Sequence, residues 1–228
     1  MDTIKNYKDR ALSSLKGNWD NAVIATLVYL AVVTVLSYGL IAILALTKVD
    51  QQIANVVQVL YIPLSWGYAV MFLNHIRGGG IKIKDIFGAF NSKDYTRVLL
   101  TMLLQGLIIL LGMLLLIVPG IILALMFSQT YFIMKDDPEM RYMKVLKKSA
   151  AMMEGHKWEY FKLMFSFIGW VLLSAILWIG VLWLNPYMYT TTAHYYEDLK
   201  AEEAEEAEEV QEVQEVQEVQ EVQEVDFK

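Results

Sequence analysis

Three histidines are the side chains of this 228-residue chain best suited to acid–base or metal chemistry. Imidazole and carboxylate form a common ligand set for transition metals. Four carboxylates are expected at the same depth as His75, His156 and His194, namely Glu154, Glu159, Glu197 and Asp198. The chain has no H-E-x-x-H motif and no cysteine, so the pattern is weak. We therefore expect no catalytic residue, no metal site, no cofactor and no enzymatic activity. An interfacial hydrolase that uses His156 and His194 is kept as an alternative.

Three glutamines inside apolar stretches form a second set of candidates. Gln58, Gln105 and Gln129 can hydrogen-bond between membrane helices or line a path for an uncharged substrate. The apolar stretches hold no charged side chain well inside them, whereas ion-coupled carriers use intramembrane Asp, Glu, Lys or Arg. The pattern favours interhelical hydrogen bonds. A transporter or lipid-translocating channel with a neutral polar path is the alternative function.

Small residues recur every four positions at Gly120, Ala124 and Ser128. Such a ridge lets another helix approach closely. It favours close packing within the chain, with a homo-oligomer formed through these three residues as the alternative.

The elements that must position these residues are long apolar helices. Hydrophobic residues make up 56% of the chain, and about 20 apolar residues cross the roughly 30 Å of hydrocarbon in a bilayer. We predict an all-α, polytopic transmembrane helical bundle of about six spans in residues 22–199, with five spans as the alternative. The predicted spans are 22–46, 53–76, 98–118, 120–134, 160–184 and 186–199, with a kink at Pro63 and turns at Pro119-Gly120 and Asn185-Pro186.

Charge is divided between a basic body and an acidic tail. Residues 201–228 hold eleven Glu, one Asp and one Lys, a net charge of −11, and the rest of the chain is therefore +5. Lys and Arg collect before the first span, between the second and third, and between the fourth and fifth. Cytoplasmic loops concentrate these residues. We predict a multi-pass protein of the bacterial cytoplasmic membrane with both termini in the cytoplasm.

Amphipathic basic stretches precede the spans. Residues 1–20 predict a cytoplasmic surface helix, and residues 138–157 predict a second one, capped by Asp137 and Pro138. Each ends in a glycine, Gly17 or Gly155, that permits a turn before an aromatic anchor. Anionic lipid headgroups are the expected partners, and nucleic acid is not. The candidate headgroup contacts are Arg141, Lys144, Lys147, Lys148 and Lys157.

The acidic tail, residues 201–228, repeats Glu, Gln and Val with a period of three. Valines at every third position drift around a helix and form no lasting apolar stripe. We expect this segment to be disordered or a fraying helix.

Four sequence boxes occur in order and carry a family resemblance. They are Pro119-Gly120, Ser149 to Lys157 (SAAMMEGHK), Ser166 to Trp170 (SFIGW) and Pro186 to Tyr196 (PYMYTTTAHYY). The chain resembles the bacterial membrane proteins grouped as domain of unknown function 975 over most of residues 10–199. The resemblance implies a polytopic membrane protein and no particular activity. We expect a non-catalytic, membrane-organising component that binds lipid or protein.

Overall fold

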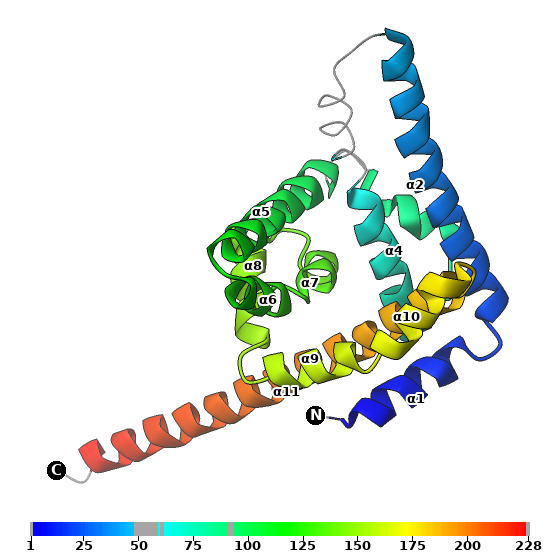
Figure 1. Cartoon of the computed structure of the whole chain (residues 1–228). Helices are drawn as coiled ribbons and strands as arrows, with labels where there is room; N and C mark the ends of the chain where they lie inside the picture. Colours follow the sequence, from blue (N-terminus) through cyan, green and yellow to red (C-terminus); the bar gives the residue numbers. More distant parts are fainter. Residues whose placement is uncertain (1, 48–58, 60–61, 91–93, 227–228) are drawn as a thin grey trace.

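The computed structural model describes residues 2–47, 59, 62–90 and 94–226, and regular structure in this part of the chain is helical, without a strand. Figure 1 shows the elements around α4 and the first half of α11. In chain order they are α1 (Ile4–Leu15), α2 (Trp19–Thr47), α4 (Pro63–Asn74), the π-helix η2 (His75–Gly79), the 3-10 helix η3 (Ile83–Phe90), α5 (Asp94–Leu115), α6 (Ile117–Met126), α7 (Thr130–Asp136), α8 (Met143–Met152), α9 (Lys157–Phe165), α10 (Ile168–Leu177) and α11 (Val181–Asp226).

Among the described residues, four helical segments are long and apolar enough to cross a membrane, judged by length and composition. They are Trp19–Gly39, Asp94–Leu115, Ile117–Asp136 and Lys157–Leu177. Many of their apolar side chains face outward. Leu115, at the tip of the α5–α6 hairpin, has 76% of its surface exposed. Soluble monomers rarely leave large apolar patches uncovered, so this is the fold of a membrane-spanning protein.

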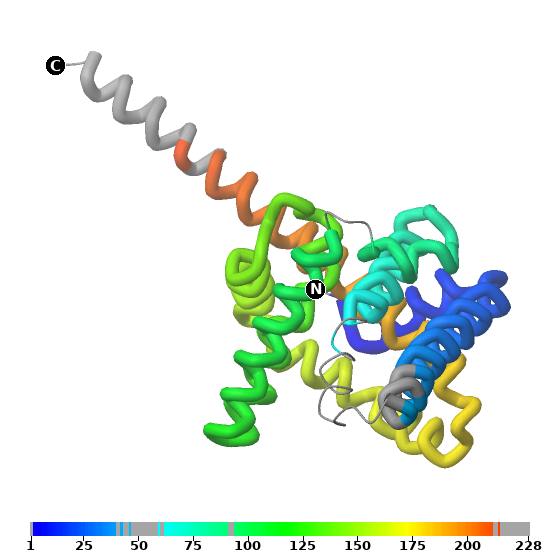
Figure 2. Tube along the Cα trace, turned by 90° about the horizontal axis from the view of Figure 1, so that it is seen from above, coloured from blue at the N-terminus to red at the C-terminus, as the bar shows by residue number. Residues whose placement is uncertain are grey.

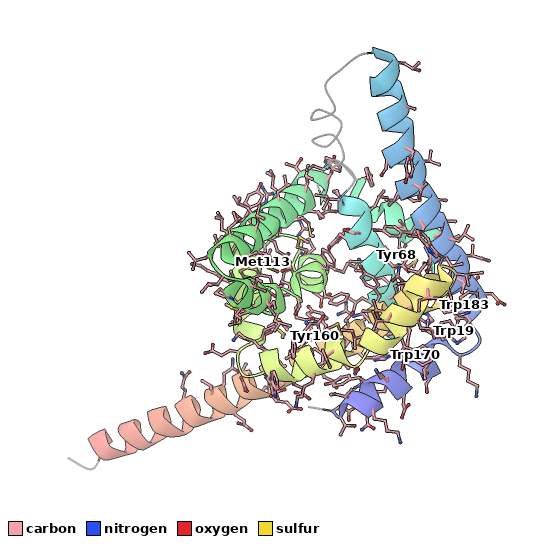
Figure 3. All side chains as sticks on the ribbon, viewed as in Figure 1. Trp19, Tyr68, Met113, Tyr160, Trp170 and Trp183 are labelled. Atoms are coloured by element: carbon pink, nitrogen blue, oxygen red, sulfur yellow. The ribbon has the colours of Figure 1, made fainter. Side chains whose placement is uncertain are left out.

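The core lies where α4 meets α11 and the neighbouring helices. α4 is buried at nearly every position. Its Tyr68, labelled in Figure 3, packs edge-on against Tyr189 of α11 with ring centroids 5.1 Å apart. The Tyr68 hydroxyl lies 2.7 Å from Thr26 Oγ1 of α2. A helix that is apolar all round belongs inside a bundle, so α4 is a core helix.

The predicted N-terminal helix forms as α1, and protein covers its apolar face. Thr3 caps the helix, its Oγ1 accepting a hydrogen bond from the backbone N–H of Asn6. Tyr7, Ala11 and Leu15 are fully buried. The Tyr7 ring lies 5.2 Å from that of Tyr195 in α11. The placement of α1 on a membrane surface stays a prediction.

Two glycines turn the chain in the same way. Gly17 follows α1 and Gly155 follows α8, and each has a φ of 80°. This is the left-handed region that glycine enters without steric penalty. An apolar helix follows at Trp19 and at Lys157, respectively. The predicted glycine turns are confirmed at both places.

The turn between the last two helices, α10 and α11, lies earlier in the chain than expected. α10 ends at Leu177 and α11 begins at Val181, so the chain reverses at Trp178–Gly180 and Asn185-Pro186 is wrong as the turn. Trp178 adopts a φ of 43°, and Gly180 packs against Ser174. Pro186 is the sixth residue of α11 and therefore lies inside this helix, not at a turn before it. The predicted span 160–184 therefore ends about seven residues early.

The predicted span 53–76 is described only in part. Residues 48–58 and 60–61, including Gln58, lie outside the described residues. Pro63 is the first residue of α4 and does not kink the middle of a helix. Proline suits this position because the first N–H groups of a helix have no intrahelical partner.

The acidic tail continues α11 as a helix to Asp226. Figures 1 and 2 show this helix running out from the body of the protein. Disorder or fraying of this tail stays a prediction. The buried first half of α11 supplies a helical nucleus, and Ala, Glu and Gln have good intrinsic helix propensity.

Candidate functional site

An ion-pair cluster joins three separate parts of the chain. Arg77 of η2 contacts both carboxylate oxygens of Asp136, at 2.6 and 2.8 Å, and its Nε donates to Glu197 at 2.9 Å. Lys200 Nζ and the Tyr196 hydroxyl donate to the same Asp136 oxygen, at 2.6 and 3.0 Å. Asp136 first, and Glu197 with it, raise the pKa of the Arg77 guanidinium. Arg77 therefore stays charged at any physiological pH.

A second pair fixes α1 to α11. Arg10 donates to both oxygens of Asp198, at 2.7 and 2.9 Å, and to Asp2 at 3.2 Å. These hydrogen bonds, led by that to Asp198, raise the pKa of Arg10. Both clusters lie at the end of the bundle where α1, η2 and α7 meet α11. The structure thus gathers the N-terminal segment, the loop after the second predicted span and the loop after the fourth.

Two of the three histidines converge on one serine. His194 Nε2 lies 2.9 Å from Ser14 Oγ, and His75 Nε2 lies 2.8 Å from the Ser14 carbonyl oxygen. A serine hydrolase needs a carboxylate to orient its histidine, but Arg10 already holds both oxygens of Asp198. The lack of enzymatic activity stays a prediction.

His156 stands apart from the other two histidines, 3.5 Å from Glu202. Among the described residues, no group of three or more His, Asp or Glu side chains is placed to hold a metal ion.

The candidate headgroup contacts divide into exposed and partnered side chains. Arg141, Lys144 and Lys147 are exposed. Lys157 is half-buried as the first residue of α9. Lys148 is also half-buried, and its Nζ lies 3.0 Å from Asp137.

The helix that carries Lys144, Lys147 and Lys148 starts later than expected. α8 begins at Met143, after Tyr142, which has a φ of 49°. The predicted cap at Asp137 and Pro138 is therefore wrong. The Asp137 carboxylate pairs with Lys148 instead of the backbone N–H groups of a first turn.

The polar candidates Gln105 and Gln129 both form hydrogen bonds at a break between α6 and α7. The Phe127 carbonyl accepts hydrogen bonds from Gln105 Nε2 at 3.2 Å and from Thr130 Oγ1 at 2.7 Å. Ser149 Oγ of α8 donates to the Met126 carbonyl at 2.8 Å. These side chains satisfy backbone groups that a continuous helix would bond internally.

Gln129 lies at the same break and is fully buried. Its Nε2 donates to Ser128 Oγ at 2.9 Å, and its backbone N–H donates to Ser149 Oγ at 3.3 Å. Gln105 and Gln129, the two candidate glutamines among the described residues, are thus placed to stabilise the break. A path lined by these residues stays a prediction.

A cavity of about 340 Å³ adjoins this break, between α7, α9 and α11. Figure 3 shows its Tyr160 on α9. Apart from Ser128, its polar lining was not anticipated from the sequence. These further polar residues are Tyr131, Tyr160, Asn185, Tyr189 and Thr192. Asn185, Tyr189 and Thr192 recur at i, i+4 and i+7, a helical face that the sequence displays but that tyrosine-rich core helices also show.

In the ridge of small residues (Gly120, Ala124 and Ser128), Gly120 packs against another helix of the same chain. Gly120 is buried against α5, where an added Cβ would lie 2.9 Å from the Met113 Cα atom. Figure 3 labels Met113 on the neighbouring helix. Ala124 is half-buried, and Ser128 lines the cavity. A homo-oligomer through these residues stays a prediction.

Comparison with protein-family models gives a match over nearly the whole body. The model described as Protein of unknown function (DUF975) matches residues 1–124 and 112–203. The chain belongs to this family. In this DUF975 chain the matched range includes every element from α1 to α10 and the buried part of α11, and it leaves out the acidic tail from residue 204. Neither the curated proteins nor the solved structures give a match to the chain.

The DUF975 boxes noted in the sequence fall on structural contacts. Ser149 bonds the α6–α7 break, and Gly155 makes the turn before α9. The Ser166 carbonyl, freed at the break between α9 and α10, accepts a hydrogen bond from Lys8 Nζ at 3.0 Å. The same ammonium lies 4.3 Å from the centre of the Phe167 ring.

Proposed function

We propose that this protein is a non-catalytic component of the bacterial cytoplasmic membrane that binds and organises membrane lipids through a basic surface formed by α8 and the residues just before it. The observation that carries the proposal is the exposure of Arg141, Lys144 and Lys147 without a carboxylate partner. All three are exposed, and no carboxylate among the described residues pairs with them. Anionic headgroups supply the missing counter-charge, and each such cation contributes about 1 kcal/mol near an anionic leaflet.

A second surface supports the same function. η3 exposes Ile83, Phe87 and Phe90 beside the exposed Lys82 and Lys84. Apolar side chains that enter the acyl boundary, with lysines at headgroup depth, are typical of a helix lying on a membrane. η3 and α8 are therefore proposed as the cytoplasmic surface helices, together with α1.

A six-span topology with both termini in the cytoplasm is part of the proposal. α2 leaves from the end near Ser14, and α4 returns there, because His75 after α4 lies 2.8 Å from the Ser14 carbonyl. α9 and α10 run from Lys157 to the turn at Trp178–Gly180. α11 then returns to Glu197 over roughly 25 Å, close to the width of the hydrocarbon. If α4 and α11 each cross the full width of the membrane on the way back, the number of crossings is even.

The lipid proposal is tested on the whole protein in nanodiscs that contain phosphatidylglycerol and phosphatidylethanolamine. The variant is Arg141→Ala/Lys144→Ala/Lys147→Ala, and the control is the charge-conserving Arg141→Lys/Lys144→Arg/Lys147→Arg. Loss of about 3 kcal/mol predicts roughly a hundredfold weaker preference for phosphatidylglycerol, measured by exchange of labelled lipid. An unchanged preference in the alanine variant would overturn the proposal.

A transporter or lipid-translocating channel is the second candidate function. The specific observation in its favour is the uncharged cavity beside the α6–α7 break, since discontinuous helices commonly form the substrate sites of carriers. Solute flux through proteoliposomes tests it. Flux of neutral solutes no faster than through protein-free liposomes would remove this candidate.

A further inference from the structure

The cavity at the α6–α7 break has an uncharged polar lining. Its hydrogen-bonding groups are five hydroxyls and one amide, from Ser128, Tyr131, Tyr160, Asn185, Tyr189 and Thr192. The other lining residues are a phenylalanine and two methionines. No Asp, Glu, Lys, Arg or His is among them. A charged ligand would lose its hydration here without a counter-charge, at a large free-energy penalty, so the lining selects an uncharged molecule.

The break leaves one lone pair of the Ser128 hydroxyl available to a ligand. The Phe127 and Met126 carbonyls are already bonded by Gln105, Thr130 and Ser149. Ser128 Oγ accepts a hydrogen bond from Gln129 Nε2 at 2.9 Å. Its proton is used in a hydrogen bond to the Tyr160 hydroxyl, so one acceptor lone pair of Ser128 remains, because a hydroxyl carries one donor and two acceptor lone pairs.

On α11, the Asn185 amide and the Thr192 hydroxyl lie on the same face of the helix and both line the cavity. The Asn185 side chain makes no hydrogen bond to the described residues. It therefore has two donors and an acceptor available. Thr192 Oγ1 donates to the Tyr189 carbonyl at 2.9 Å and keeps its lone pairs for a ligand. Asn185 thus presents donors and an acceptor to the cavity, and Ser128 and Thr192 present acceptors.

Aromatic rings give the same cavity flat apolar surfaces. Tyr131, Tyr160 and Tyr189 each combine an apolar ring with a polar hydroxyl. A ligand with hydroxyl groups around a ring that also has C–H faces matches both features. The volume, about 340 Å³, is at the lower end of the range for small-molecule sites.

We propose that this cavity binds an uncharged, polyhydroxylated ring, either a free sugar or the sugar headgroup of a glycolipid. The proposal rests on the second candidate function for its site. It concerns binding alone, so transport can fail while binding holds. Loss of binding leaves the lipid contacts of α8 untouched.

The experiment measures binding to the purified full chain in phospholipid nanodiscs, free of sugar-based detergent. The probes are radiolabelled glucose and monoglucosyl-diacylglycerol, with glucose 6-phosphate as the charged comparison. We expect saturable binding of at least one of the first two, and binding of glucose 6-phosphate at least tenfold weaker than that of glucose. Binding of glucose identifies a free sugar as ligand, and binding of the glycolipid alone identifies a headgroup.

Matched variants locate the site. Asn185→Leu/Thr192→Val removes polar groups at similar volume and is expected to weaken binding at least tenfold. Thr191→Val makes the same change at the neighbouring buried position of α11, where the hydroxyl bonds the Tyr187 carbonyl, and is expected to stay within twofold of wild type. Tyr160→Phe, which removes one hydroxyl and keeps the ring, replaces the double variant if that does not fold. Failure of both sugar probes to bind, or equal binding to wild type and cavity variants, would overturn the proposal.

Discussion

Arg77 and Asp136 form a two-point ion pair, with Nη1–Oδ1 and Nη2–Oδ2 distances of 2.6 and 2.8 Å. The pair joins η2 to the end of α7. Through Glu197 and Lys200 it also holds both to α11. Two predicted loops that are far apart in the sequence are thereby locked to one helix.

Asp136→Asn should therefore lower the free energy of unfolding by about 2 kcal/mol, since hydrogen bonds to charged groups contribute roughly 1.5–3 kcal/mol. The substitution removes the charge that Arg77 and Lys200 share. Asp137→Asn is the matched control, because its single, half-exposed pair with Lys148 should contribute less than about 1 kcal/mol. Thermal unfolding in nanodiscs measures both, and equal losses would contradict the assigned role of Asp136.

Gly120→Ala should destabilise the α5–α6 hairpin by about 1–3 kcal/mol, because the new Cβ overlaps the Met113 side chain and backbone. Gly106→Ala, in the same hairpin, meets nothing within 4 Å. It should be neutral or stabilising by up to about 1 kcal/mol. The difference between the two midpoints of thermal unfolding is the measurement. If Gly120→Ala proved neutral, the close approach of α5 and α6 would be wrong.

Ser149→Ala should lower stability by about 1–3 kcal/mol, since the Met126 carbonyl and the Gln129 N–H lose a buried partner. Ser13→Ala on the exposed side of α1 is the control and should change stability by less than about 0.5 kcal/mol. Unfolding followed by tryptophan fluorescence separates the two. A loss as small as that of the control would show that other groups or water satisfy the break.

The topology can be tested with single cysteines, because the chain has none of its own. Lys84→Cys and Glu205→Cys should react with a membrane-impermeant maleimide only when the cytoplasmic side is open. Ile179→Cys should react from the opposite side, since it lies in the turn between α10 and α11. Labelling of positions 84 and 205 from opposite sides would exclude the six-span topology.

The sequence predicts the long apolar helices well, because length and hydrophobicity are local properties of the chain. Residues 22–46, 98–118 and 120–134 fall close to helices of the structure. The predicted turn at Pro119-Gly120 is wrong, because the chain turns at Leu116 and both residues lie within α6. The family was also predicted correctly from its sequence boxes.

The helix breaks and the cavity could not be predicted in the same way. The breaks at Phe127–Gln129 and at Ser166–Phe167 contain neither glycine nor proline. Their freed carbonyls are bonded by Gln105, Ser149 and Lys8, which are far away in the sequence. A local pattern cannot display such partners. Asn185 was read as a turn residue, which hid its place in the cavity wall.

α11 connects the cavity, the ion-pair cluster and the acidic tail. One helix carries Asn185 in the wall of the cavity, Glu197 in the ion-pair cluster and, farther along, the glutamates beyond residue 200. Because one helix joins these positions, a change in the tilt of α11 would move the cavity wall and the ion-pair cluster together.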